Sequence, residues 1–187
     1  MKSITDYNLI GISGKIGSGK STLALFLNIL RPEYKRNSFA ENVRKVTSIS
    51  TGIPIENMRS SDDKNVYVEE WNMTVGELFQ TWGTKGREIN PDAWVNSLFS
   101  AFDENSRWVI DDVRYPNEAD RIRAKGGILI RLEGDPKNIR LHSKRNLDHE
   151  SETALDNYPF FDVILNTDIF NTSDTVTEIN RKLRLTK

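Results

Sequence analysis

Residues 9–21 of the chain read LIGISGKIGSGKS. The run at 9–13 is short and apolar, and a glycine follows it, which is the pattern of a buried parallel strand. Residues 14–21 fit the phosphate-loop pattern G-x-x-x-x-G-K-[ST] without a mismatch. The next ten residues place Leu23, Leu27 and Leu30 on one helical face. A strand before the glycines and a helix after them is the context that this pattern requires.

The composition of the loop explains how it would bind phosphate. Its glycines let the backbone turn so that successive amides point toward phosphate oxygens, and the helix that follows adds its positive end. Lys20 would neutralise the β- and γ-phosphates, and the Ser21 hydroxyl would ligate Mg²⁺. The sequence therefore predicts ATP binding with Mg²⁺ at these residues: Gly14, Gly17, Ser18, Gly19, Lys20, Ser21 and Thr22.

Composition excludes several classes of protein and site. The chain has 187 residues, a net charge of -1, no cysteine and two histidines, so disulfides, thiolate metal sites and histidine-rich metal sites are excluded. A balanced charge argues against nucleic-acid binding. No stretch approaches the roughly 20 apolar residues of a membrane span, and the N-terminus lacks the apolar run of a signal peptide. We expect a soluble, cytoplasmic protein, in the host cytoplasm if a virus encodes it.

Apolar runs and helical stripes alternate along the chain. This alternation predicts a three-layer α/β fold with a parallel sheet of about five strands and helices on both faces. Ligands bind such sheets at the carboxyl ends of their strands. The expected strands are 9–13, 34–39, 108–110, 128–132 and 162–165. The expected helices are 21–30, 39–50, 74–82, 91–102, 117–125, 150–155 and one capped by Ser173, with Asn90 capping the helix at 91 and residues 60–70 forming an exposed loop.

A second acidic element fits the same site. Residues 107–112 read RWVIDD, an apolar strand that ends in aspartate, which is the Walker B arrangement for a carboxylate near Mg²⁺. We expect Asp112 to serve the metal together with Ser21, and spacing alone leaves Asp111 open. The chain has no guanine-reading N-K-x-D segment, which argues against a GTPase switch, and its scattered arginines suit a kinase that grips two phosphorylated ligands.

A family resemblance extends over nearly the whole chain. Residues 112–120 read DVRYPNEAD, and Gly126-Gly127 follows. This stretch resembles the D-V-R-[FY]-P-N-E-A segment of phage-type deoxynucleoside monophosphate kinases. Weaker matches follow the family order: SFA at 38–40, QTWGT at 80–84 with an arginine and a tryptophan behind it, HESE at 149–152 and DVILN at 162–166. After Asn166 the family often has an Asp-Gly turn, whereas this chain continues Thr167-Asp168-Ile169.

The resemblance implies a kinase that transfers the γ-phosphate of ATP to a deoxynucleoside monophosphate. Lys20, Asp112 and Arg114 would be its catalytic residues, with Arg114 binding the acceptor phosphate. The plain alternative for Arg114 is a surface pair with Glu118, worth about 0.3–0.5 kcal/mol. The implied substrate-binding residues are Phe39, Ala40, Gln80, Arg87, Trp94, Arg114, His149 and Glu152, of which Phe39 and Trp94 fit a core role equally well.

Other expectations concern regions and rival functions. We expect a single kinase domain, with an acceptor-binding helical region at about 38–104 and a lid-like loop at about 134–149. Arg140 and Arg145 of that loop would bind ATP, or else form a solvated basic loop. The rival substrate class is that of animal-type phosphomevalonate kinases, which the ESE at 150–152 and LDN at 155–157 resemble. A nucleotide-binding module without turnover is the third hypothesis, and a homodimer is left open.

Overall fold

The protein is described by a computed structural model that covers residues 3–103, 105–142 and 149–185. It divides into two compact units. The first, which we call the sheet unit, comprises Met1–Asn37 and Asp103–Lys187. The second, the helical unit, is Ser38–Phe102. The helical unit is thus an insertion in the chain of the sheet unit.

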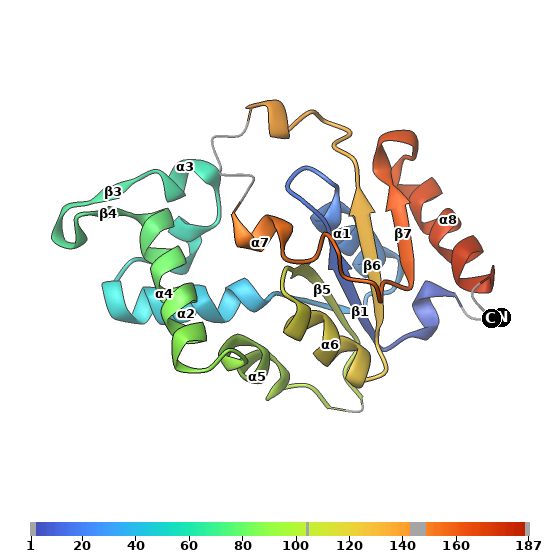
Figure 1. The fold of residues 1–187 in the computed structure, drawn as a ribbon, viewed down its shortest axis with the longest axis horizontal. Coiled ribbons are helices and arrows are strands. Elements are labelled where there is room, and N and C mark those ends of the chain that lie inside the picture. The colour runs from blue at the N-terminus through green and yellow to red at the C-terminus, as the bar shows by residue number, and fades with distance from the viewer. Residues whose placement is uncertain (1–2, 104, 143–148, 186–187) are drawn as a thin grey trace. The chain divides into compact units, whose positions relative to one another are not determined.

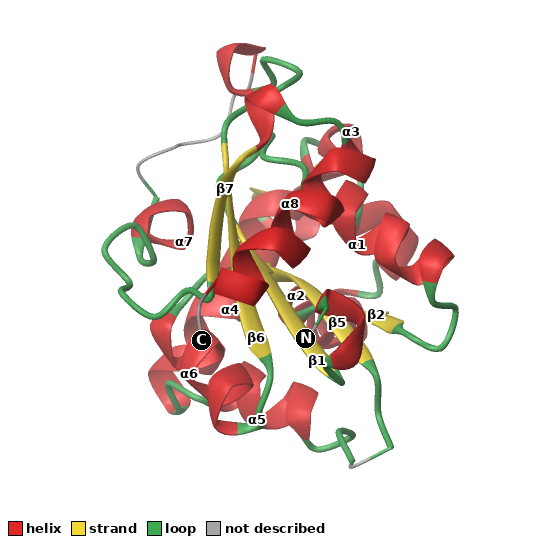
Figure 2. Ribbon diagram, turned by 90° about the vertical axis from the view of Figure 1, so that its right-hand side faces the viewer, coloured by secondary structure: helices red, strands yellow, loops and turns green. Residues whose placement is uncertain are grey.

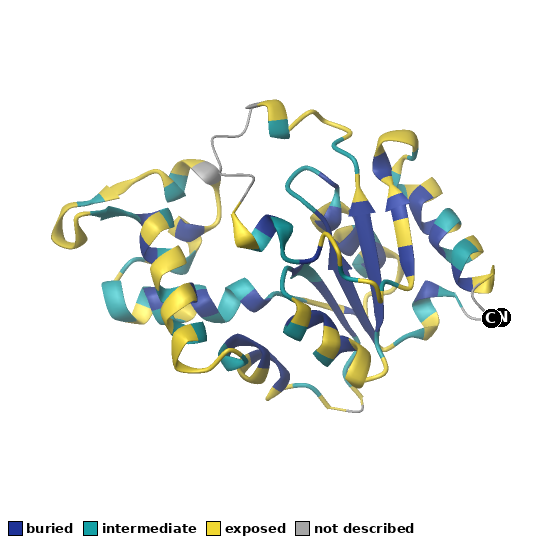
Figure 3. Cartoon of the chain, in the orientation of Figure 1, coloured by how far each residue is buried: buried dark blue, intermediate teal, exposed yellow. Residues whose placement is uncertain are grey.

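The sheet unit is built on five parallel strands, whose order is β2, β5, β1, β6, β7. Their bounds are β1 (Leu9–Ser13), β2 (Lys35–Asn37), β5 (Trp108–Val113), β6 (Ile128–Glu133) and β7 (Val163–Asn166). All five residues of the central strand β1 are buried, as Figure 3 shows by colour. The loop that follows β1 therefore leaves from the middle of the carboxyl edge of the sheet (Figure 1).

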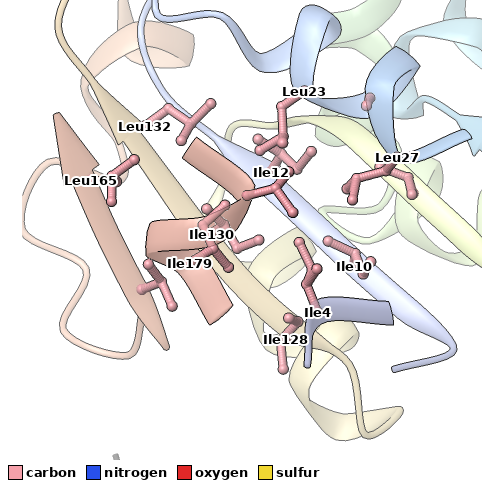
Figure 4. Packing of buried hydrophobic residues seen from close by; sticks show 14 of the residues in the cluster. Ile4, Ile10, Ile12, Leu23, Leu27, Ile128, Ile130, Leu132, Leu165 and Ile179 are labelled. Carbon is pink, nitrogen blue, oxygen red and sulfur yellow. The ribbon is translucent and has the colours of Figure 1, made fainter. Parts of the chain in front are cut away.

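Helices cover both faces of this sheet. Helices α1 (Lys20–Leu30) and α8 (Thr172–Leu185) pack side by side on one face, and α6 (Pro116–Ala124) packs against β1 and β6 on the other; Figure 2 shows the first two in front of the strands. The first face buries one apolar cluster, drawn in Figure 4, which includes Ile10, Ile12, Leu23, Leu27, Ile128, Ile130, Leu165 and Ile179. The predicted three-layer α/β fold with five parallel strands is confirmed.

The approach of α6 to the sheet depends on a glycine in β1. A Cβ atom at Gly11 would lie 2.7 Å from Ile122 Cδ1 and 2.8 Å from Leu129 Cδ2. These two side chains fill the space above Gly11, and Ile122 is fully buried. The glycine inside the strand therefore sets the close packing of α6 on β1.

The helical unit has its own apolar core. Its main helices are α2 (Phe39–Thr51), α4 (Val75–Ile89) and α5 (Ala93–Phe99), which contact one another. Trp94 is buried against α4, where a Cβ atom at Gly86 would overlap its ring. Its indole N–H donates to the Gly83 carbonyl at 2.8 Å. Gly86 thus leaves space for the Trp94 ring, and the Gly83 carbonyl accepts its hydrogen bond.

Three local predictions, of one loop and of two helix starts, are wrong. Residues 60–70 are not a plain loop: they contain α3 (Ser61–Lys64) and β3 (Tyr67–Val68), the latter paired with β4 (Met73–Thr74). Ser60 accepts a hydrogen bond from the Asp63 N–H, which starts α3 as an N-cap. Helix α8 begins at Thr172, and Asn171 rather than Ser173 accepts from the Asp174 N–H at 2.9 Å.

The third correction concerns Asn90. Its side chain accepts from the Asp92 N–H at 2.9 Å, and the helix that follows begins two residues later than expected, at Ala93. The short elements are η1 (Ile4–Asp6), η2 (Ile55–Met58), η3 (Glu69–Trp71), η4 (Arg140–His142), α7 (Glu150–Thr153) and η5 (Thr167–Ile169). Among the described residues, no helix combines the length and the apolar character that crossing a bilayer requires.

Truncation of Ile122 tests the packing of α6. We expect Ile122→Ala to lower the free energy of unfolding by about 2–5 kcal/mol, because it removes a fully buried side chain and leaves a cavity over Gly11. Urea denaturation measures the change. Ile29→Ala is the matched control, since Ile29 on α1 is 64% exposed and its loss should change stability little. Equal effects of the two substitutions would contradict the packing described.

Candidate functional site

The loop between β1 and α1 has a backbone that glycine permits. Gly14, Gly17 and Gly19 have φ values of 150°, 85° and 87°. A Cβ atom at Gly14 would overlap the carbonyl oxygen of Leu132 on β6, whereas at Gly19 it would meet nothing within 4 Å. When residues in left-handed and right-handed backbone conformations follow one another, their N–H groups point to the same side and form a concavity that binds anions. The glycines of the predicted phosphate loop therefore adopt backbone conformations that are compatible with such an anion-binding backbone.

Thr167, the first residue of η5 directly after β7, supports this loop. Its hydroxyl lies 3.1 Å from the Ser18 carbonyl and 2.7 Å from the Glu133 carbonyl, so it links the loop to the end of β6. The Ser18 side chain is fully buried, and its hydroxyl has no hydrogen-bond partner among the residues that the structure describes. Sequence reasoning missed Thr167, although it stands where the chain departs from the family pattern.

Lys20, the first residue of α1, is a buried cation. Its ammonium donates to the Lys15 carbonyl at 2.7 Å, and its exposed fraction is 8%. Burial, with a smaller contribution from the charge of Arg114, lowers the pKa of Lys20 to about 7, while the charges of Glu152 and Asp111 oppose this shift. A phosphate group bound beside the ammonium would raise this pKa again. Lys20 is thus placed to bind an anion at the start of the helix.

Two carboxylates stand at the end of β5, where the sheet is irregular. The register between β1 and β5 shifts between Gly11 and Ser13, next to Asp111 and Asp112, as is common beside active sites. Asp111 accepts from Arg36 at 2.8 Å, and its charge acts on Lys20. Asp112 is partly exposed. Asp111, which the sequence analysis left open as a metal ligand, thus lies close enough to act on Lys20. The metal role of either aspartate stays a prediction.

The oxygen atoms near the loop suit a metal ion that binds together with a phosphate ligand. Among residues 3–103, 105–142 and 149–185, no three histidine or carboxylate side chains converge to hold a metal. Ser21 and Thr22 are exposed on the first turn of α1. Mg²⁺ usually binds through one or two protein oxygens together with substrate phosphates and water. Ser21 and one β5 carboxylate fit that role.

Arg114 directly follows β5 and points at α7. Its guanidinium binds the Glu152 carboxylate and donates to the Ser151 carbonyl at 3.1 Å. Glu118 instead accepts from the backbone N–H of Arg114 at 2.7 Å and of Tyr115 at 3.1 Å, which caps α6. The plain alternative, a surface pair between Arg114 and Glu118, is therefore wrong.

Ile16 in the phosphate loop is held from both sides. Its N–H donates to Glu152 at 2.9 Å, and its carbonyl accepts from the Arg140 guanidinium at 2.9 Å. Arg140 also donates to the Gly134 carbonyl. His149 caps α7, where its ring nitrogen accepts from the Ser151 N–H at 3.2 Å. The structure thus brings Arg140 and Glu152 to the loop; Arg145 lies outside the described residues.

A second ion-pair network holds Lys15, the residue before Ile16 in the loop. Asp156 binds Lys15 at 2.8 Å and Arg131 at 2.6 Å, and Arg131, which is buried on β6, donates to the Ser13 hydroxyl at 3.1 Å. This network ties β6, the end of β1 and the loop together. Sequence reasoning missed Arg131 and Asp156, because an arginine inside an apolar strand pattern gives no sign of its partner.

The remaining predicted residues belong to the helical unit. Phe39 and Trp94 are buried there, and Phe39 packs against Phe99 with ring centroids 6.3 Å apart. Arg87 donates to the Gly83 carbonyl at 3.1 Å, and Gln80 is exposed on α4. Ala40, in the first turn of α2, is partly exposed. Core positions account for the two aromatic residues, and the substrate role of all five stays a prediction.

Comparison with known proteins identifies no family for the chain. No protein-family model and no curated protein sequence matches it. Among solved structures, it is similar to an unliganded sugar kinase from Janibacter sp. HTCC2649, at 15% sequence identity and a TM-score of 0.42, over 95% of each chain. Similarity at this level transfers no role to individual residues, so the assignment of the site depends on its own geometry.

Alanine at two loop glycines tests the conformation of the loop. Gly14→Ala should destabilise the protein strongly, because its Cβ overlaps the Leu132 carbonyl of a central strand. Gly19→Ala meets no atom and should cost only the left-handed backbone, about 1–2 kcal/mol. Urea denaturation of both variants compares the losses. A smaller loss at Gly14 than at Gly19 would refute the described packing.

The lowered pKa of Lys20 predicts a pH dependence of stability. The folded protein releases this proton near pH 7, whereas the unfolded chain keeps it up to about pH 10.5. Between these values the unfolded state binds more protons, so the contribution of Lys20 makes stability rise with pH. We expect the wild type to gain stability relative to Lys20→Met between pH 7 and pH 9, measured by urea denaturation at each pH. Parallel curves for the two proteins would contradict the burial of a titrating lysine.

Proposed function

We propose that the chain is an ATP-dependent phosphotransferase that phosphorylates a deoxynucleoside monophosphate. The observation that carries the proposal is that Glu152 holds both the Ile16 N–H of the phosphate loop and the Arg114 guanidinium. Arg114, directly after β5, is thereby a second cation beside the loop that leads to Lys20. Lys20 belongs to a glycine loop suited to the donor phosphates, and Arg114 provides a planar fork suited to a second phosphate. A site that serves nucleotide binding alone has no need of this second cation.

The residues support a mechanism of positioning and charge neutralisation. An oxygen of the acceptor phosphate attacks the γ-phosphorus of ATP in line, and the bond from this phosphorus to the β-phosphate oxygen breaks to release ADP. The acceptor oxygen is already ionised at neutral pH, so no strong general base is needed. Lys20 would stabilise charge on the donor, and Arg114 would hold the acceptor. Ser21 and a β5 carboxylate would hold Mg²⁺, which would supply positive charge to the transferred phosphate.

The acceptor is assigned by the family resemblance. The segment from Asp112 to Asp120 matches the most specific motif of phage-type deoxynucleoside monophosphate kinases. The residues proposed to read the nucleotide, including Gln80 and Arg87, lie in the helical unit. Residues 150–152 and 155–157, which resemble phosphomevalonate kinases, favour a small phosphorylated acceptor as the second candidate.

A coupled assay of ADP release tests the proposal. We expect turnover of ATP with at least one of dTMP, dGMP, dCMP and dAMP, and phosphomevalonate serves as the rival acceptor in the same assay. Lys20→Ala should reduce kcat/KM at least about 100-fold, because it removes a cation that stabilises the transferred phosphate. Lys125→Ala, at an exposed lysine beyond α6, should behave as the wild type.

The outcomes separate the candidate functions. Turnover with phosphomevalonate alone would favour the second candidate. ATP binding without product for any acceptor would indicate a binding module and overturn the enzymatic proposal. Near-normal activity of Lys20→Ala would overturn the assignment of the phosphate loop.

A further inference from the structure

We propose that Glu152 makes the binding of donor and acceptor phosphates cooperative, because its one carboxylate holds a hydrogen-bond donor of each phosphate site. This inference depends on the proposed function. Oε2 of Glu152 accepts from the Ile16 N–H of the phosphate loop at 2.9 Å, while Oε1 binds the Arg114 guanidinium. Backbone N–H groups and arginine forks are the donors that bind phosphate. Glu152 is therefore an internal competitor for both ligands.

The charges around Glu152 support this role. Glu152 is 8% exposed, and its negative charge raises the pKa of Lys20 while Arg114 and Arg131 lower it. The carboxylate thus offsets the repulsion among three cations. Phosphate groups bound to the same cations would offset this repulsion themselves, and they would repel a carboxylate that stayed beside them. Phosphate binding therefore favours release of Glu152.

The surroundings let Glu152 move without the loop. The Ile16 carbonyl is held by Arg140, and Lys15 is held by Asp156, so the loop keeps two anchors when the Glu152 bond breaks. Leu155 is buried at 2% exposure and fixes the chain just after α7. Rotation of the Glu152 side chain is then sufficient to remove the carboxylate from the Ile16 N–H and from Arg114, whose guanidinium keeps its bond to the Ser151 carbonyl.

Cooperativity follows from the shared cost of this release. The first phosphate to bind, at the Ile16 N–H or at Arg114, bears the free-energy cost of displacing the carboxylate. The second phosphate no longer meets the carboxylate, so its binding free energy is more favourable by that cost. A coupling of this kind typically corresponds to a factor of about 5–150 in affinity, and it is reciprocal between the two ligands.

Calorimetric titration with AMP-PNP tests the coupling. Its dissociation constant is measured with and without saturating inorganic phosphate, which serves as the probe of the acceptor site. We expect phosphate to tighten AMP-PNP binding at least 5-fold more in the wild type than in Glu152→Gln. The variant should also bind AMP-PNP more tightly than the wild type when phosphate is absent, since the neutral amide competes less well.

Two further variants serve as controls. Glu150→Gln changes an exposed glutamate of the same helix and should keep the wild-type coupling. Glu152→Asp keeps the charge on a shorter side chain and should restore part of the coupling, which a merely structural role would not predict.

The results distinguish this inference from the proposed function. Two results would overturn the role of Glu152 and leave the kinase proposal intact. One is equal coupling in the wild type and Glu152→Gln. The other is weaker AMP-PNP binding by Glu152→Gln than by the wild type when phosphate is absent. Absence of AMP-PNP binding by the wild type would overturn both.

Discussion

The burial of Lys20 is the constraint on which the arrangement of the site depends. An ammonium that is 8% exposed and close to Arg114 and Arg131 is unfavourable unless anions lie near it. The chain supplies two such anions from separate segments, Asp111 from β5 and Glu152 from α7. Asp156, in the turn after α7, pairs with Arg131. Each carboxylate pairs with an arginine as well. The loop, the strand ends and α7 are therefore held together by charge, and the same cations are the groups suited to phosphate.

Much of the fold could be predicted from the sequence because its signals are local. The apolar run of β1, the glycine pattern after it and the amphipathic stripe of α1 all lie within residues 9–30, and each has one physical interpretation. Gly126, with φ 74°, ends α6 as the sequence indicates. The three-layer sheet follows from repetition of such signals. The elements predicted most accurately are buried strands and amphipathic helices, because burial imposes a distinctive pattern of apolar side chains on each.

The wrong or missing predictions concern interactions between distant residues. The apolar stripe predicts a helix over 74–82, whereas α4 continues to Ile89, and Gly86 within the added turns leaves room for the Trp94 ring. Likewise, Glu152 was predicted as a substrate residue, but its bonds to Ile16 and Arg114 join positions that are 136 and 38 residues away in the chain. No local pattern encodes such a pair. The local elements around the glycine loop could therefore be predicted from the sequence, whereas the bonds between distant residues could not.

The helical unit enters and leaves the sheet unit through neighbouring strands. It follows β2 and precedes β5, and these strands pair in parallel from Lys35 with Trp108 to Asn37 with Ile110. The two attachment points are thus fixed by the sheet itself and do not depend on what lies between them. Because closure entropy rises only slowly with the length of the connecting segment, an insert at this point can vary in length at little cost. The chain is in this sense modular: residues 38–102 can vary without any change to the glycine loop and its ion pairs.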